Sequence, residues 1–338
     1  MRIALIGAGL MGSTHVRSAL GNPMIQFTAI CDVFRASAEK TAALCGAKVY
    51  TDVDEMLNCE ELDAVLISTP DHLHADAAIK ASNAGLAVML EKPFATTRED
   101  GERMMRAFKA NGTKVQMCHL FRFLPFYMNM KTAAVNGELG EILSNNVIMQ
   151  NKISVPTKML RWAASSSPSW FLLSHSIDAI MWVNDCRVKS LSATGVRKKL
   201  VSLGVDTYDI VRVSAELENG ALASFEANWV IPEATPITAS VQMLISGTEG
   251  AISLNTGDPI ITKSTPNAYS IPGILEYDLY GYYSGLRRNM IESFARSVEN
   301  GTEPPTTALD GFNTLCVLEA IDRSMERNGE KIVLTYDY

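Results

Sequence analysis

Short apolar segments alternate with helical segments over the first 120 residues, and this alternation is the strongest constraint on the fold. The apolar residues occupy consecutive positions, which is typical of parallel strands covered on both faces. Strands joined through helices form right-handed crossovers and a doubly wound sheet. The expected strands are Arg2–Ile6, Phe27–Cys31, Lys48–Tyr50, Ala64–Ser68, Ala87–Leu90 and Lys114–Cys118. The expected helices cover about 11–20, 36–45, 52–58, 73–84 and 97–111. Six such strands match a Rossmann fold.

The pattern changes after residue 120, where a helix over about 124–136 leads out of the first domain. Long runs rich in Val, Ile, Leu, Ser and Thr follow at 187–201, 206–218, 221–231 and 238–246, with a helix over 170–183. The tail is helical over about 285–328 and ends in a possible strand, Lys331–Thr335. We therefore predict an α/β protein with two domains. Residues 1–120 form a Rossmann domain with a doubly wound parallel sheet, and 121–338 form an α+β domain with a large open, mainly antiparallel sheet.

Composition limits the classes of partner. The chain has 338 residues, 30 Lys and Arg against 37 Asp and Glu, and a formal net charge of −7. Without a basic block, nucleic acid and anionic membranes are not expected as partners. Its longest apolar runs, such as Leu86–Leu90, are far shorter than the ~20 residues that a membrane span requires. Six scattered cysteines without a C-x-x-C pair predict reduced thiols, and with no signal peptide they predict a cytoplasmic protein.

A glycine-rich motif follows the first strand directly and opens a helix. Gly7 permits a tight turn, Gly9 lets a pyrophosphate approach the backbone, and Gly12 allows close packing of helix and strand. The helix N-terminus adds N–H donors. Asp32 lies 32 − 12 = 20 residues beyond Gly12, the spacing expected of a carboxylate that binds ribose. The predicted dinucleotide site comprises Gly7, Gly9, Leu10, Met11, Gly12 and Asp32.

The same segment bears on the choice of dinucleotide. A carboxylate at Asp32 accepts hydrogen bonds from ribose hydroxyls and repels a 2′-phosphate. Arg35 either pairs with such a phosphate or is a solvated cation at the start of a helix. We expect NAD as the cofactor in preference to NADP.

Two further motifs follow the fourth and fifth strands, at the edge where a doubly wound sheet binds its ligands. Ser68, Thr69 and His74 belong to the first, and Glu91-Lys92-Pro93 is the second. We predict that each residue named in these two motifs, except Pro93, contacts the cofactor. His74 instead hydrogen-bonds the backbone at its helix start in the alternative interpretation. Lys92 is placed to help deprotonate a substrate hydroxyl. His72 and His74 lack a nearby third ligand, so no metal is expected.

These motifs, together with His175 and Asp178 in an H-x-x-D pattern, resemble the Gfo/Idh/MocA oxidoreductase family. That family includes inositol dehydrogenases and glucose–fructose oxidoreductases. The resemblance covers nearly the whole chain. Val115–Phe126 is similar to the link into the second domain, Gly137–Ile142 to the first strand of that domain, and Gly247–Gly250 to a late sheet turn.

The resemblance implies a dehydrogenase acting on CH–OH groups of a sugar, sugar derivative or cyclic polyol. It implies hydride transfer to or from a nicotinamide, with Lys92 and His175 handling the hydroxyl proton. It also implies a homodimer or homotetramer formed through the open sheet. Two other classes stay open: a glycoside hydrolase or eliminase that retains NAD, and a nucleotide-dependent sensor without catalysis.

One position departs from the family pattern. Inositol dehydrogenases resembling this chain have an aspartate four residues before the histidine, where Phe171 stands here. Asp178 either replaces that carboxylate or is a helix charge without a catalytic duty, and Phe171 and Trp170 are candidates for an apolar wall against a sugar ring. Other substrate-binding candidates from segments expected to border the cleft are Arg122, Arg161 and Trp162. Arg161 is alternatively a loop ion-pair partner.

Overall fold

The computed structural model describes residues 1–338 except 161, 259–261, 266–267, 271–274 and 280–281. The chain divides into two compact units. The first comprises Met1–Leu124, Ile274–Leu315 and Asp337–Tyr338, and the second comprises Pro125–Gly273 and Cys316–Tyr336. A C-terminal segment that the predicted division at residue 120 assigns to the second domain thus belongs to the first unit.

The first unit contains a six-stranded sheet in the order β3-β2-β1-β4-β5-β6, with every pairing parallel. Its strands are β1 Arg2–Ile6, β2 Gln26–Cys31, β3 Lys48–Tyr50, β4 Ala64–Ile67, β5 Ala87–Leu90 and β6 Val115–Met117. The order reverses between β1 and β4, which is the switch point where open α/β sheets bind ligands. The predicted Rossmann sheet is confirmed.

Helices connect these strands at the predicted positions. They are α1 Leu10–Ala19, α2 Arg35–Ala42, α3 Val53–Cys59, α4 His74–Asn83 and α5 Arg98–Asn111, with the 3₁₀ turns η1 Asp71–Leu73 and η2 Leu120–Phe123. The Thr97 hydroxyl accepts the Asp100 N–H at 3.2 Å and so caps α5.

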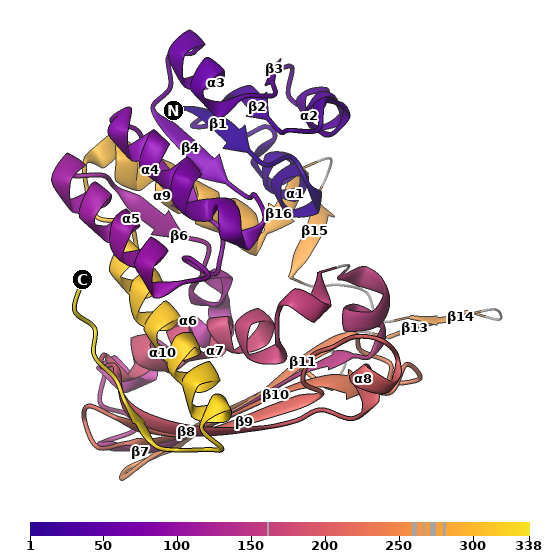
Figure 1. Cartoon of the computed structure of the whole chain (residues 1–338), viewed down its shortest axis with the longest axis vertical. Coiled ribbons are helices and arrows are strands. Elements are labelled where there is room, and N and C mark those ends of the chain that lie inside the picture. The colour runs from indigo at the N-terminus through magenta and orange to yellow at the C-terminus, as the bar shows by residue number, and fades with distance from the viewer. Residues whose placement is uncertain (161, 259–261, 266–267, 271–274, 280–281) are drawn as a thin grey trace. The chain divides into compact units, whose positions relative to one another are not determined.

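Helix α9 (Leu286–Asn300) completes the core of the first unit although it lies far along the chain. Its Met290, Ile291 and Phe294 are fully buried in the same apolar cluster as Leu5 and Ile30. In Figure 1 it is the orange helix of this unit. The sheet therefore obtains part of its apolar cover from a segment that follows residue 285 in sequence.

The second unit contains a seven-stranded sheet in the order β12-β11-β7-β10-β9-β8-β17. Its strands are β7 Ile142–Lys152, β8 Val188–Val196, β9 Ile210–Leu217, β10 Leu222–Ile231, β11 Ala239–Gly247, β12 Ala251–Asn255 and β17 Ile332–Val333. Only the β7–β10 pairing is parallel among these, so the expected mainly antiparallel sheet is confirmed. Two antiparallel strand pairs complete the described strands: β13 Lys263–Thr265 with β14 Ala268–Ser270 in the second unit, and β15 Glu276–Leu279 with β16 Tyr282–Gly285 in the first.

Two expectations about the second unit were wrong. The run 187–201 is divided between β8 and a short helix, α8 (Lys199–Ser202), whose first N–H groups are held by the Asp209 carboxylate. The segment Gly137–Ile142 is a turn that leads into β7, because Gly137 and Gly140 have φ values of 73° and 65°. The other helical elements are α6 Pro125–Val135, η3 Val155–Met159, η4 Ala163–Ser165, η5 Ser169–Leu173, α7 Ser174–Asn184 and α10 Ala308–Glu326.

The two faces of the second sheet differ in chemistry. Val211 and Val213 of β9 point to the buried face, whereas Arg212 between them lies on the outer face. There Arg212 pairs with Glu226 of β10 at 2.7 Å. The apolar side chains of β9 are thus buried within the unit, and its outer face carries this ion pair. The expected homodimer or homotetramer stays a prediction.

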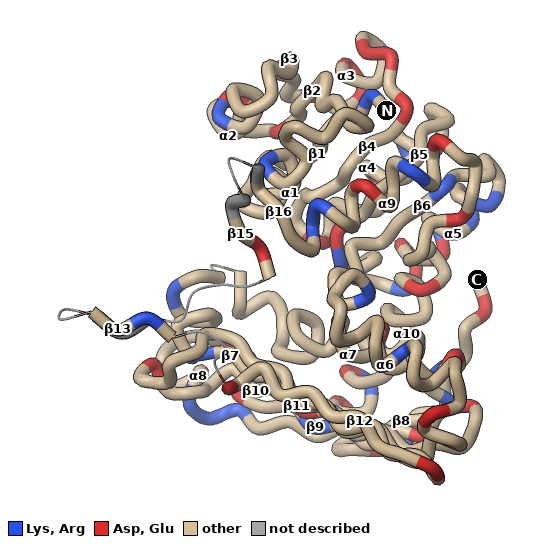
Figure 2. Tube along the Cα trace, turned by 180° about the vertical axis from the view of Figure 1, so that it is seen from behind, with Lys and Arg blue, Asp and Glu red and all other residues tan. Residues whose placement is uncertain are grey.

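Basic and acidic residues are interspersed along both units, as Figure 2 shows. None of the helices in the described part of the chain is long and apolar enough to cross a membrane. Within the described part of the chain, no disulfide joins any of the six cysteines.

Candidate functional site

The glycine loop between β1 and α1 is shaped by close backbone packing at two of its three glycines. Gly7 has a φ of +94°, and a Cβ there would lie 2.5 Å from the Ser68 carbonyl oxygen. A Cβ at Gly12 would lie 2.0 Å from the Gly7 carbonyl oxygen. A Cβ at Gly9 would meet no atom of the described residues within 4 Å. The open space at Gly9 therefore fits the approach of a pyrophosphate, while Gly7 and Gly12 shape the loop around it.

Asp32, directly after β2, fastens this loop. One of its carboxylate oxygens accepts the Ala8 N–H at 2.7 Å, and the other accepts the Phe34 N–H at 2.8 Å. The side chain is half-buried, so its remaining lone pairs are open to a ligand. The carboxylate thus has a structural duty in addition to the predicted ribose contact.

Arg35 forms an exposed ion pair with Glu39, four residues on in α2, at 2.9 Å. Exposed pairs of this kind contribute little, about 0–1 kcal/mol, to stability. This geometry fits the interpretation of Arg35 as a solvated cation at the helix start.

The position of Asp32 leads to a prediction about nucleotide preference. Asp32→Ala is expected to raise the Kd for NAD by about tenfold or more, because hydrogen bonds to a charged group contribute about 1.5–3 kcal/mol. The Kd for NADP should rise less, since the repulsion of a 2′-phosphate is removed together with the ribose contact. Titration calorimetry with both nucleotides measures the ratio, with Lys40→Gln on the exposed side of α2 as the control. Equal losses for both nucleotides would mean that the ribose is held elsewhere.

Apolar side chains are exposed beside the glycine loop. Leu10 is 81% exposed, Val33 78% and Phe34 73%. They follow the neighbouring strands β1 and β2 at the ligand-binding edge, where exposed apolar groups mark binding surfaces. Val33 and Phe34 were missed by sequence reasoning, although two apolar residues directly after Asp32 are an available signal.

The residues after β4 connect to the tripeptide after β5. His74 is buried at the start of α4, with Nδ1 2.8 Å from the Pro93 carbonyl oxygen and Nε2 3.1 Å from that of Thr69. The predicted backbone bonding of His74 is confirmed. Burial lowers the pKa of His74, more than the neighbouring Asp71 and the backbone oxygens raise it. The Thr69 hydroxyl is buried and has no hydrogen-bond partner among the described residues, which fits a polar group of the cofactor.

Lys92 is the half-exposed residue within a buried segment, Ala87–Ala95. The Glu91 carboxylate next to it accepts the Lys92 N–H at 3.1 Å and lies 2.6 Å from His15 Nε2 on α1. Burial acts to raise the pKa of Glu91, but the hydrogen bond and charge of His15, with Lys92 and Arg287, lower it to about 2. An ionised Glu91 therefore lies behind a lysine that reaches the surface.

In the second unit, Phe171 of η5 lies in a row of aromatic rings. Its centroid is 5.9 Å from that of Trp162 and 5.7 Å from that of Trp229. Trp170, which was expected to share a wall with Phe171, instead donates its indole N–H to Asp322 on α10 at 2.6 Å. A wall formed by Phe171 and Trp170 together stays a prediction. The wall beside Phe171 contains Trp162.

His175 and Asp178 lie three residues apart on α7. His175 is half-buried and Asp178 is fully buried. Arg122, in the first unit, is buried and pairs with Asp310 at 2.9 Å. Burial acts to raise the pKa of Asp310, and the charge of Arg122 holds it below its usual value. A substrate contact by Arg122 stays a prediction, and Arg161 lies outside the described residues.

The hydrogen bond between Trp170 and Asp322 leads to a prediction about pH. Burial raises the pKa of Asp322 to about 6, above its value in an unfolded chain, and the Trp170 bond opposes this rise only in part. The folded state therefore binds the proton more tightly, and stability falls as the pH rises from about 4 to about 6. Asp322→Asn retains an acceptor for Trp170 without the charge. It is expected to raise the free energy of unfolding at pH 7 by roughly 1–3 kcal/mol, and by much less at pH 4. Urea unfolding at both pH values measures this, and equal effects at both would contradict it.

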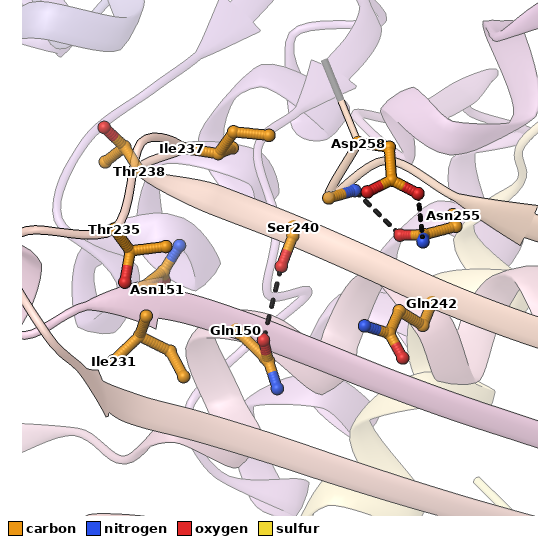
Figure 3. A pocket seen from close by; sticks show the side chains of 11 residues that line it. Gln150, Asn151, Ile231, Thr235, Ile237, Thr238, Ser240, Gln242, Asn255 and Asp258 are labelled. Carbon is orange, nitrogen blue, oxygen red and sulfur yellow. Dashed lines mark hydrogen bonds between the residues drawn. The ribbon is translucent and has the colours of Figure 1, made fainter.

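A separate polar pocket of about 210 Å³ opens on the second sheet (Figure 3). Amide and hydroxyl side chains dominate its lining, including Gln150 and Ser240, which are joined by a hydrogen bond of 3.4 Å. None of the described candidate residues lines it, so it is distinct from the groups described above.

Comparison with known proteins agrees with this arrangement. Residues 1–119 match the family model for the oxidoreductase family with an NAD-binding Rossmann fold, and residues 127–253 match the GFO/IDH/MocA C-terminal domain. The chain belongs to the Gfo/Idh/MocA oxidoreductase family. Its first unit is an NAD-binding Rossmann domain, and the expected enzyme class, a dehydrogenase acting on CH–OH groups, is confirmed.

Members of this family with similar sequence or structure are known. Inositol 2-dehydrogenase of Rhizobium meliloti (strain 1021) is 27% identical over 96% of this chain and 97% of its own length. Scyllo-inositol dehydrogenase from Lactobacillus casei, solved with bound NAD(H) and scyllo-inositol, has 20% identity and a TM-score of 0.84, covering 98% of each chain. The WlbA dehydrogenase from Bordetella pertussis, solved with NADH and UDP-GlcNAcA, has 22% identity and a TM-score of 0.81, covering 100% of this chain and 99% of that one. These two structures share the fold.

Proposed function

We propose that this protein oxidises a CH–OH group of a sugar, sugar derivative or cyclic polyol with NAD, or runs the reverse reduction. The observation that carries the proposal is Lys92, which emerges from a buried segment directly after β5 of an NAD-binding sheet. The similarity to an inositol 2-dehydrogenase over nearly the full length of both chains supports the substrate class. Bound NAD supplies the hydride acceptor.

The chain's own residues have separate duties in this proposal. The loop Gly7–Gly12 holds the pyrophosphate, and Asp32 accepts hydrogen bonds from the ribose. Ser68, Thr69 and His74 after β4, with Glu91 and Lys92 after β5, border the nicotinamide end. Lys92 Nζ holds the substrate hydroxyl and receives its proton, and the imidazole of His175 exchanges that proton onward.

Phe171 is assigned to specificity. An aromatic ring flanked by Trp162 offers a flat apolar surface, and a sugar or polyol ring presents C–H groups to such a surface. Asp178 is fully buried, so we assign it to holding α7 and His175 in place. A substrate with an apolar ring face is therefore favoured over one that is polar on both sides.

The test is formation of reduced nicotinamide, followed by absorbance, across inositols, sugars and sugar acids with NAD and NADP in parallel. The Lys92→Met variant, assayed under the same conditions, is the negative control for turnover. Turnover of a polyol or sugar with NAD that is lost in the variant is the expected result. Product formed from a glycoside without net reduction would indicate the NAD-retaining hydrolase, and tight nucleotide binding without any turnover would indicate the sensor.

A further inference from the structure

The buried pair of His15 and Glu91 has no part in the proton path proposed above, yet it adjoins Lys92. His15 lies on α1 with no exposed surface. Its Nε2 is 2.6 Å from one Glu91 oxygen, and the other oxygen accepts the Lys92 N–H at 3.1 Å. One carboxylate therefore joins α1 to the backbone of Lys92.

Other titratable groups surround Glu91 from each neighbouring element. They are His15 of α1, His74 of α4, Lys92 itself, Cys118 after β6 and Arg287 of α9. The Cys118 sulfur lies within 4.8 Å of ligand atoms of His15 and Glu91. Burial holds the pKa of the Cys118 thiol well above its usual value, so this neighbour is neutral. Both Glu91 oxygens already have hydrogen-bond partners, in His15 Nε2 and in the Lys92 N–H.

The position of His15 also links this pair to the glycine loop. Helix α1 begins at Leu10, inside the loop Gly7–Gly12, and His15 lies about one and a half turns further along it. A buried, charge-assisted hydrogen bond is short and geometrically specific. A shift of α1 is therefore expected to move Glu91-Lys92-Pro93 with it.

We propose that His15 is a positioning residue, which fixes Lys92 through Glu91 and so couples the placement of this lysine to the nucleotide-binding loop. The inference rests on the proposed function, in which Lys92 receives the hydroxyl proton. The ligand concerned is the nucleotide already assigned to the loop Gly7–Gly12. His15 affects the geometry and the charge around Lys92.

Turnover is the first measurement. His15→Leu removes the donor and is expected to lower kcat about 10²-fold, because a small misplacement of a reacting group costs this much. The Kd for NAD should change much less. His15→Gln offers a neutral donor near the position of Nε2 and is expected to restore most of kcat. His72→Gln, the same change at an exposed histidine, is the matched control.

The pH profile of kcat/KM is the second measurement, and a merely structural role would not move it. Glu91→Gln removes a negative charge beside Lys92, so the acid limb is expected to move to lower pH by about one unit or more. His15→Leu leaves that charge less compensated, which stabilises the protonated lysine and moves the acid limb to higher pH. The two variants are thus expected to shift the limb in opposite directions.

The outcomes separate this inference from the function on which it rests. If Lys92→Met retains turnover, the proposed role of the lysine fails and the positioning role fails with it. If Lys92→Met is inactive while His15→Leu keeps both the kcat and the acid limb of the parent, only the positioning role is overturned. Should His15→Leu not fold, His15→Gln and Glu91→Gln decide: an acid limb unmoved in Glu91→Gln overturns the inference.

Discussion

Lys92→Met is expected to lower kcat by about 10²–10⁴-fold, the contribution of a positioned proton-transfer group. Methionine has a similar length and no proton to exchange, so the change removes chemistry and little volume. Lys92 makes up little of the buried core, since it is the half-exposed member of Ala87–Ala95. The Kd for NAD and the unfolding temperature should therefore stay close to those of the parent.

Lys92→Arg sharpens this test. Arginine keeps the positive charge but stays protonated at every accessible pH, so it cannot receive a proton. Loss of turnover in both variants indicates proton transfer, whereas activity in Lys92→Arg indicates that charge alone is needed. Lys109→Met, on the exposed side of α5, is the control for loss of a surface lysine. A parent-like kcat in Lys92→Met would remove this residue from the mechanism.

The glycines of the loop are expected to separate folding from nucleotide binding. Gly12→Ala places a Cβ 2.0 Å from a backbone oxygen, so the loop must move. We expect the free energy of unfolding to fall by roughly 2–3 kcal/mol, in the range of overpacked sites, and NAD binding to be lost. Gly9→Ala meets no protein atom within 4 Å and has an ordinary φ of −68°.

Gly9→Ala is therefore expected to fold as the parent does while its Kd for NAD rises about tenfold or more, because the methyl group occupies the space of the pyrophosphate. Urea unfolding without nucleotide and calorimetric titration with NAD measure the two effects separately. Equal losses of stability in Gly9→Ala and Gly12→Ala, or an unchanged Kd for NAD in Gly9→Ala, would contradict this account of the loop.

The local elements of the first unit were accessible from sequence, because consecutive apolar residues and helix-ending glycines are short-range signals. Strand β1 and strand β5 have the predicted bounds, and Gly85 ends α4 with a φ of +75°. What sequence reasoning missed depends on distant contacts. Nothing within α9 indicates that Phe294 packs with Leu5, because its apolar stripe suits any sheet.

In the candidate site, too, some features could be predicted from the sequence and others could not. The motif residues Gly9, Asp32 and Lys92 follow strands whose order could be predicted, so their common edge could be predicted too. The Asp32 bond to the Ala8 N–H and the His15–Glu91 pair could not, since each joins segments through side-chain geometry. The rings of Trp162 and Trp229 beside Phe171 could not be predicted either, because position in the sequence does not determine the direction of a side chain.

The return of α9 to the first unit has a consequence for synthesis in the cell. A ribosome releases β1 to β6 long before Leu286 is translated, and strands β7 to β12 of the second sheet emerge in between. During that interval the apolar cluster that contains Met290 and Phe294 lacks the cover that α9 supplies. A nascent chain of this protein therefore needs its nucleotide domain shielded until translation is nearly finished, and truncated messages yield a product that aggregates in place of a smaller nucleotide-binding protein.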